Sequence, residues 1–251
     1  MKSSKNSISI PTLFFAVFIL GSFFPARTLA GEVLGNDLNE DEIHEYVSLP
    51  KLRISGEVGF SKWVISPDSI SSEYDDFYSS LGLGTCASAD IEYFFWPRGG
   101  FGFSWIQFIS RAAKDNFPVQ NNSSQLHSIH ERIIVQYLGP DFIARQIITQ
   151  NTMLIAGLGA GYLTFQSTGV DNGFQYKVEA HNYAIQTHVG LEYSFLRFLA
   201  VGVEGRFLFS NLTEYTYNGV KHVLTDTQNQ FIWYNIPLYR FEISGGLRIL
   251  F

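Results

Sequence analysis

Residues 239–251, YRFEISGGLRILF, alternate between two kinds of side chain along their whole length. One face of this stretch carries Tyr239, Phe241, Ile243, Gly245, Leu247, Ile249 and Phe251. The other face carries Arg240, Glu242, Ser244, Gly246, Arg248 and Leu250. Because alternate residues of a β-strand point to opposite sides of the sheet, the pattern predicts a strand with one apolar and one polar face. Such a strand suits a position between lipid and a polar interior.

The same period of two recurs along most of the chain and predicts seven further strands. The predicted strands cover residues 51–64, 80–95, 101–111, 128–144, 152–166, 178–195, 199–210 and 234–251. Each is about as long as a tilted membrane-crossing strand, or somewhat longer.

Three of these segments alternate less clearly. In the first, apolar residues switch faces between Trp105 and Ile106, which predicts a bulge or an apolar contact inside the barrel. The second is interrupted at Gly139-Pro140, and its residues assigned to the outside are Ile129, Ile133, Val135 and Tyr137. In the third, the inward residues are Gly157, Gly159 and Gly161, which leave room for a large neighbouring side chain.

The connections alternate in length. Short connections are expected at residues 96–100, 145–151 and 196–198, and long polar ones at 65–79, 112–127, 167–177 and 211–233. Short turns at one end and long loops at the other are typical of outer-membrane barrels. We therefore predict an all-β fold, an eight-stranded antiparallel up-and-down transmembrane β-barrel. The alternative is a soluble sandwich or lipocalin-like barrel, which needs its apolar faces turned inward.

The chain begins with features of a secretory signal peptide. Lys2 and Lys5 precede an apolar run over residues 8–24, and the exit reads Thr28-Leu29-Ala30. This order predicts a signal peptide over residues 1–30 with cleavage near Ala30, and a signal anchor is the alternative. Residues 31–50 are then an acidic periplasmic leader, and residues 51–251 are the barrel domain.

Composition disfavours one class of partner and excludes disulfide bonds as a source of stability. Residues 1–30 hold three basic residues and no acidic one, so cleavage moves the formal charge from −6 to −9. An acidic balance disfavours nucleic acid as a partner. Cys86 is the single cysteine, so no internal disulfide can form.

The signal peptide, the eight alternating strands and the terminal run from Tyr239 to Phe251 resemble the small eight-stranded outer membrane β-barrel family, which includes the transmembrane domain of outer membrane protein A. The resemblance implies a location in the cell outer membrane and contact with its lipid. It also implies that the barrel assembly machinery reads the C-terminal strand. The residues that would carry this assembly signal are Leu247, Ile249 and Phe251.

Charged residues share the predicted inward face. An eight-stranded barrel is about wide enough inside for its own side chains, so these charges are expected to pair as a structural plug. The expected lumen ion-pair residues are Glu57, Asp90, Glu92, Arg132, Glu192, Glu204, Arg206, Arg240, Glu242 and Arg248. A narrow gated pore, in which the pairs exchange partners, is the alternative.

Sites for chemistry are weakly indicated. Lipid A deacylases of the same membrane are eight-stranded barrels that use Ser, His and Glu, in the order His-x-Ser. Here His127 directly precedes Ser128, and Glu131 points away from Ser128 and His130, so no catalytic residues are assigned. No metal or cofactor is expected, because the histidine pairs His127/His130 and His181/His188 lack companions at ligand spacing.

We therefore rank three roles. A structural or surface-interaction barrel with a plugged lumen comes first, a narrow channel for small solutes second, and a lipid-modifying enzyme third. The long extracellular loops are rich in Asp, Ser, Asn and Tyr, a composition suited to adaptable contacts with an extracellular ligand.

Overall fold

The computed structural model describes residues 49–64, 75–119, 122–223 and 236–251. The predicted signal peptide and the leader as far as residue 48 lie outside these residues. Within them, no helix is long and apolar enough to span a membrane.

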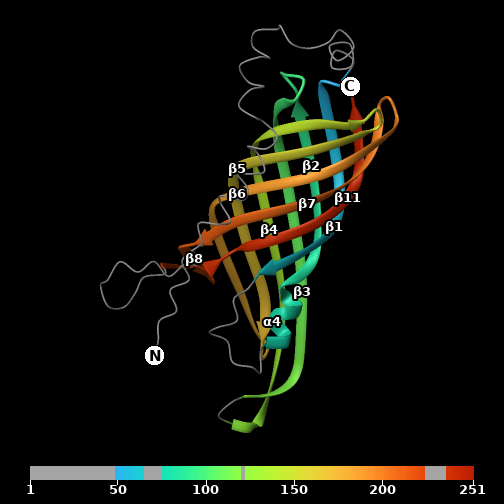
Figure 1. Ribbon diagram of the computed structural model, residues 1–251. Helices are drawn as coiled ribbons and strands as arrows, with labels where there is room; N and C mark the ends of the chain where they lie inside the picture. The colour runs from blue at the N-terminus through green and yellow to red at the C-terminus, as the bar shows by residue number, and fades with distance from the viewer. Residues whose placement is uncertain (1–48, 65–74, 120–121, 224–235) are drawn as a thin grey trace, which may run out of the picture. The chain divides into compact units, whose positions relative to one another are not determined.

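Eight antiparallel strands form a closed ring (Figure 1). They are β1 (Leu52–Val64), β2 (Leu83–Tyr93), β3 (Gly99–Val119), β4 (Asn122–Thr149), β5 (Thr152–Asp171), β6 (Phe174–Leu196), β7 (Leu199–Leu212) and β11 (Tyr239–Leu250). Each strand pairs with the next, and β11 pairs with β1 from Arg53–Leu250 to Val64–Tyr239. Closure leaves the ring without an exposed edge. The predicted fold, an antiparallel up-and-down barrel of eight strands, is confirmed.

The two ends of the ring differ. One end, called here the short-turn end, holds the connections at residues 94–98, 150–151 and 197–198 and also Phe251 (Figure 1). The opposite end, called the hairpin end, carries the extended β3–β4 and β5–β6 hairpins. The smaller elements are α4 (Asp75–Leu81), β8 (Glu214–Tyr217), β9 (Val220–Val223) and β10 (Ile236–Pro237). Because α4 occupies residues 75–81, the second strand begins at Leu83 rather than at residue 80.

The long loops predicted at residues 112–127 and 167–177 are wrong, because the strands continue past the ring as hairpins. The β5–β6 hairpin turns at Asn172 and Gly173, and the β8–β9 hairpin, inside the predicted loop 211–233, turns at Asn218 and Gly219. All four residues have positive φ, between 46° and 85°. Asn-Gly favours such two-residue turns.

Strand β4 is continuous through Gly139-Pro140, as its predicted bounds of 128–144 imply, and the interruption appears only in its pairing with β5. Pro140 lacks an N–H, and the pairing with β5 accordingly skips from Leu138–Tyr162 to Asp141–Gly159. A Cβ added to Gly139 would lie 2.5 Å from the Cα of Gly161, so glycine permits this close approach of the two backbones.

The inward face of β4 is the reverse of the prediction. Ile133, Val135 and Tyr137 are buried inside the ring. Register explains this, because directly paired residues share a face. Tyr137 pairs with Ile106, and Val135 pairs with Phe108, both of which are buried in the lumen. The apolar contact expected inside the barrel at β3 is thus confirmed, and the pairing of residues 101–110 contains no bulge.

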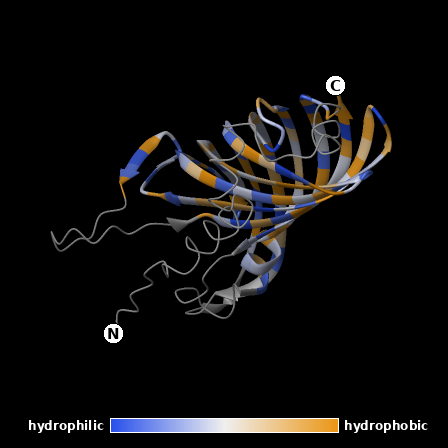
Figure 2. Cartoon of the chain, turned by 45° about the horizontal axis from the view of Figure 1, so that its top comes forward, coloured by the Kyte–Doolittle hydropathy of each residue, from blue (hydrophilic) through white to orange (hydrophobic). Residues whose placement is uncertain are grey.

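The outer face of the ring is apolar, and Figure 2 shows apolar and polar residues alternating along the strands. At the short-turn end, exposed and half-buried aromatic rings contact one another with centroids 4.8 to 6.4 Å apart. These rings belong to Tyr93, Phe95, Trp96, Phe101 and Phe142. Aromatic girdles of this kind flank the lipid-facing band of membrane barrels. A soluble lipocalin-like barrel would turn its apolar strand faces inward, so that alternative is wrong.

If this outer face contacts lipid, an arginine placed on it should be costly. Val58 lies in the middle of β1 with 70% of its surface exposed, and Val220 on β9 is 60% exposed beyond the ring. Val58→Arg should lower the free energy of unfolding by about 2–4 kcal/mol. Val220→Arg should change it by less than about 0.5 kcal/mol. Urea titration of the protein in lipid vesicles measures both, and equal effects would contradict a lipid-facing β1.

Candidate functional site in the barrel lumen

Buried ion pairs fill the lumen toward the short-turn end. Glu192 on β6 accepts hydrogen bonds from the Nε atoms of Arg53 on β1 and Arg248 on β11, both at 2.9 Å. Arg53 also reaches Glu92 on β2, with 2.5 Å between Nη1 and Oε2. Arg248 pairs in addition with Glu57 on β1. Two arginines and three carboxylates therefore link four strands across the lumen.

A second group of charges lies near the middle of the barrel. Arg206 Nη2 is 2.6 Å from Glu204 Oε1 and 3.4 Å from Asp90 Oδ1. Ser55 donates a hydrogen bond of 2.8 Å to the other oxygen of Asp90. Further toward the hairpin end, Arg240 and Glu242 form a buried pair at 2.5 Å.

Nine of the ten predicted lumen charges are buried inside the ring, and the exception is Arg132. Arg132 is exposed at the hairpin end, because β4 turns its odd-numbered residues inward. For the same reason His130 is exposed rather than inward, and its Nε2 lies 2.9 Å from Asp115 Oδ1.

Two buried charges on β4 were missed in the sequence. Asp141 and Arg145 both point inward, and assigning the odd-numbered residues of β4 to the lumen would have identified them. Arg145 donates hydrogen bonds to the carbonyl oxygens of Pro97 and Pro50 at 2.7 and 2.6 Å. Its guanidinium carbon lies 3.8 Å from the ring centroid of Phe94. Arg145 thus links β4 to three other residues at the short-turn end.

An apolar cluster fills the lumen toward the hairpin end. Its buried members are Phe77, Leu81, Ile106, Phe108, Ile133, Val135, Tyr137, Leu163, Phe165, Ala180, Ala184, Leu208, Leu212 and Leu238. Phe77 and Leu81 come from helix α4 and the others from the barrel strands or the β10–β11 connection. A cavity beside Phe108 and Leu208 measures about 10 Å³, about the space of a single water.

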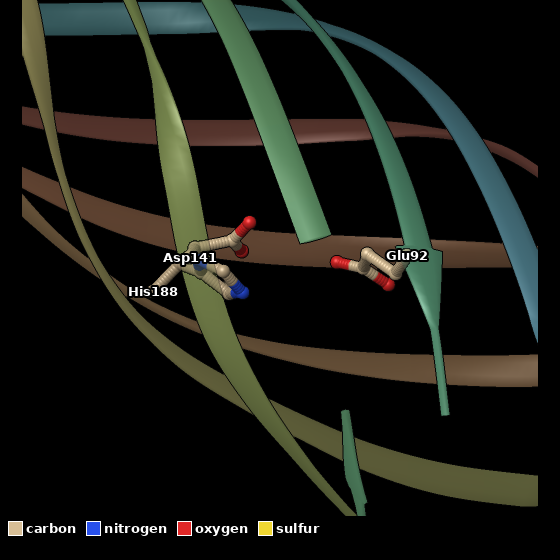
Figure 3. Close-up of side chains that lie close together, drawn as sticks. All are labelled: Glu92, Asp141 and His188. Atoms are coloured by element: carbon tan, nitrogen blue, oxygen red, sulfur yellow. The ribbon is translucent and has the colours of Figure 1, made fainter. Parts of the chain in front are cut away.

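Three chemically active side chains converge between the charged groups (Figure 3). Glu92 on β2, Asp141 on β4 and His188 on β6 each place one ligand atom within 4.8 Å of the others. His188 was expected to lack companions at ligand spacing, but the two carboxylates reach it from other strands. A Cβ added to Gly157 would lie 2.2 Å from His188 Cε1, so the glycine face of β5 does accommodate a large neighbour, as predicted.

The hairpin end carries an open depression of about 960 Å³. Its charged lining residues are Arg111, His130, Glu131, Arg132 and Lys177. Within the described side chains, Ser128, His130 and Glu131 do not form a hydrogen-bonded set. His130 pairs with Asp115, and Glu131 accepts a hydrogen bond from Ser167. The side chain of His127 lies outside the described residues.

No protein-family model matches the sequence, and no curated protein matches it. A major outer membrane protein from Thermus thermophilus aligns over 80% of this chain and 99% of its own, with 10% identity and a TM-score of 0.51. The outer membrane protease OmpT from Escherichia coli aligns over 80% and 97%, with 9% identity and a TM-score of 0.44. Neisserial surface protein A aligns over 80% and 97%, with 12% identity and a TM-score of 0.43.

At these identities the likeness concerns the fold alone. The likeness to the Thermus thermophilus protein agrees with the closed ring of eight strands. The described part of the chain therefore has the fold of the outer-membrane β-barrel proteins.

Proposed function

We propose that this chain is an integral outer-membrane barrel with a closed lumen, which acts as a structural or surface-interaction protein. The observation that carries the proposal is that buried side chains occupy the lumen in successive layers. Arg145 and Phe94 cover the short-turn rim, ion pairs fill the next layer, and the apolar cluster follows. Helix α4 adds Phe77 and Leu81 at the hairpin end.

Passage of solutes would require several of these layers to move together. Phe108 and Ile106 are fully buried, and Arg206 is tied to carboxylates on two strands. Breaking such pairs exposes charges in a confined interior at high cost. The filled lumen therefore favours the structural role over the channel.

Surface interaction would use the hairpin end. Figure 1 shows the β3–β4 hairpin reaching beyond the ring there. The open depression beside it presents Arg111, Arg132 and Lys177 with Tyr176. Arginine and tyrosine are common in protein contact surfaces, which supports this end as the place where an extracellular partner would bind.

Assembly would use the seam between β11 and β1. Phe251 donates its N–H to the carbonyl oxygen of Leu52 at 2.9 Å and accepts from the N–H of Lys51 at 2.7 Å. The side chains of Leu247, Ile249 and Phe251 are all exposed on the outer face. These outward side chains are the part of the strand that we propose the barrel assembly machinery reads.

Osmotic swelling of proteoliposomes tests the closed lumen. With small sugars outside, vesicles that contain the wild-type protein should swell no faster than empty vesicles, because buried ion pairs and the apolar cluster would block the passage of sugars. Rapid swelling with the wild-type protein would contradict the proposal and favour a solute channel.

Arg206→Ala should destabilise the barrel, because it leaves Glu204 and Asp90 without their arginine. The expected loss is about 3–5 kcal/mol of unfolding free energy, together with faster swelling in the sugar assay. The matched control is Lys177→Ala, which breaks the exposed Lys177–Glu179 pair of 2.7 Å and should cost less than about 1 kcal/mol. Similar losses in urea titrations would show that burial does not strengthen the Arg206 pairs.

Phe251→Ala should lower the amount of protein in the outer membrane of cells, because it removes the outward terminal aromatic ring. The matched control is Phe195→Ala, which removes another exposed ring near the short-turn end. Both variants should refold into vesicles and lose similar amounts of unfolding free energy, because each loses one lipid-facing aromatic ring. Outer-membrane fractions with heat-modifiable migration on gels report the levels. Equal levels of the two variants would refute the assembly role.

A further inference from the structure

We propose that Glu92, Asp141 and His188 bind a divalent transition-metal ion, of which zinc is the best candidate, inside the barrel. The site would join strands β2, β4 and β6 within the charged layer. Its function would be to crosslink the barrel wall from within, which goes beyond the structural role proposed above and does not depend on it.

The geometry brings three ligand atoms to one point. One carboxylate oxygen of Glu92, one of Asp141 and one ring nitrogen of His188 all lie within 4.8 Å of one another. Figure 3 shows the three side chains directed toward a shared space. Zinc ligands stand about 2.0–2.2 Å from the metal and therefore somewhat closer together, a difference that side-chain rotation can close.

Two of the three side chains are buried without hydrogen-bond partners. Asp141 is 3% exposed, and neither of its carboxylate oxygens has a partner. His188 is 2% exposed, and neither ring nitrogen has a partner. Burying polar groups without partners is costly, and an ionised carboxylate is the costliest case. A metal ion bound between them would satisfy both residues at once.

The charge balance of the interior also calls for cations. Among the described residues, seven carboxylates but only five arginines are buried. The carboxylates are Glu57, Asp90, Glu92, Asp141, Glu192, Glu204 and Glu242, and the arginines are Arg53, Arg145, Arg206, Arg240 and Arg248. When all are ionised and His188 is neutral, the excess is two negative charges, which one divalent cation cancels.

Neighbouring residues keep the site open and oriented. Gly102 on β3 pairs with Glu92 on one side and Asp141 on the other. A Cβ added there would lie 2.7 Å from Asp141 Oδ1 and 2.8 Å from Glu92 Cγ, so any larger residue would crowd the two carboxylates. Arg53 holds the other side of the Glu92 carboxylate through Oε2, as groups outside a metal site commonly hold its ligands.

The chemistry of the three ligands indicates which metal ion would bind. One imidazole and two carboxylates form a mixed nitrogen and oxygen set, which suits zinc and related divalent ions. Calcium prefers six to eight oxygen ligands, and magnesium keeps several waters, so neither fits three residues that include a histidine. Three protein ligands leave a fourth position for water.

Metal uptake by the refolded protein tests the proposal. The chain from Gly31 onward is refolded into lipid vesicles in the presence of EDTA, transferred to chelator-free buffer, loaded with zinc and dialysed. Elemental analysis should find one zinc ion retained per chain. Zinc should also raise the unfolding temperature, because it binds the folded state.

Two variants and one matched control locate the metal. Asp141→Asn and His188→Ala should lose both the retained zinc and the zinc-dependent rise in unfolding temperature. His181→Ala should keep both, because His181 lies on the same strand but is exposed and stacks on Tyr162. This control accounts for zinc bound by surface histidines.

Zinc retention unchanged in Asp141→Asn and His188→Ala would place the metal elsewhere and overturn the proposal. If the variants do not fold, the wild-type protein alone still decides, because refolded wild type that retains no zinc also overturns it. The swelling assay is independent of this result, so the closed lumen and the metal site can fail separately.

Discussion

An eight-stranded ring encloses a space that its own side chains fill, so every charge that points inward needs an opposite charge beside it. In this barrel the requirement is met chiefly by arginines that bridge strands far apart in the chain. Arg53 on β1 and Arg248 on β11 both bind Glu192 on β6. Because β1 and β11 form the seam of the ring, these bonds tie the seam to a strand across the lumen.

The remaining parts of the molecule follow from that filled interior. The apolar cluster, which includes two residues of α4, lies in the lumen toward the hairpin end, and the outer face of the ring is apolar. Strand β4 differs from β1, β6 and β11 in how its inward carboxylate is paired. Its Asp141 lies beside His188 and Glu92 with no hydrogen-bond partner for its oxygens. The proposed metal ion would give Asp141 on β4 the positive partner that arginines give the carboxylates at the seam between β1 and β11.

Sequence periodicity predicted the strands well where the two faces differ in polarity, as in β1, β6 and β11. It failed to orient β4, because Ile133, Val135 and Tyr137 are apolar whether they face lipid or the lumen. The register with Ile106 and Phe108 settles the orientation, and pairing between strands is not visible in one strand's pattern. Because the wrong face of β4 was assigned to the lumen, Arg132 was misplaced, and Asp141 and Arg145 were omitted. This assignment also hid Asp141 as a companion of His188, whereas Glu92 was predicted inward but approaches His188 only when the ring closes.

The central claim is that buried arginine–carboxylate pairs hold the lumen together, and a double-mutant cycle on Arg248 and Glu57 tests it most directly. The side chains of both residues are fully buried, and they join β11 to β1. Urea titrations in lipid vesicles would compare the wild type, Arg248→Met, Glu57→Gln and the double variant. The account predicts a coupling energy of about 1 to 3 kcal/mol, with the double variant more stable than the sum of the single losses implies. A coupling energy near zero would contradict it.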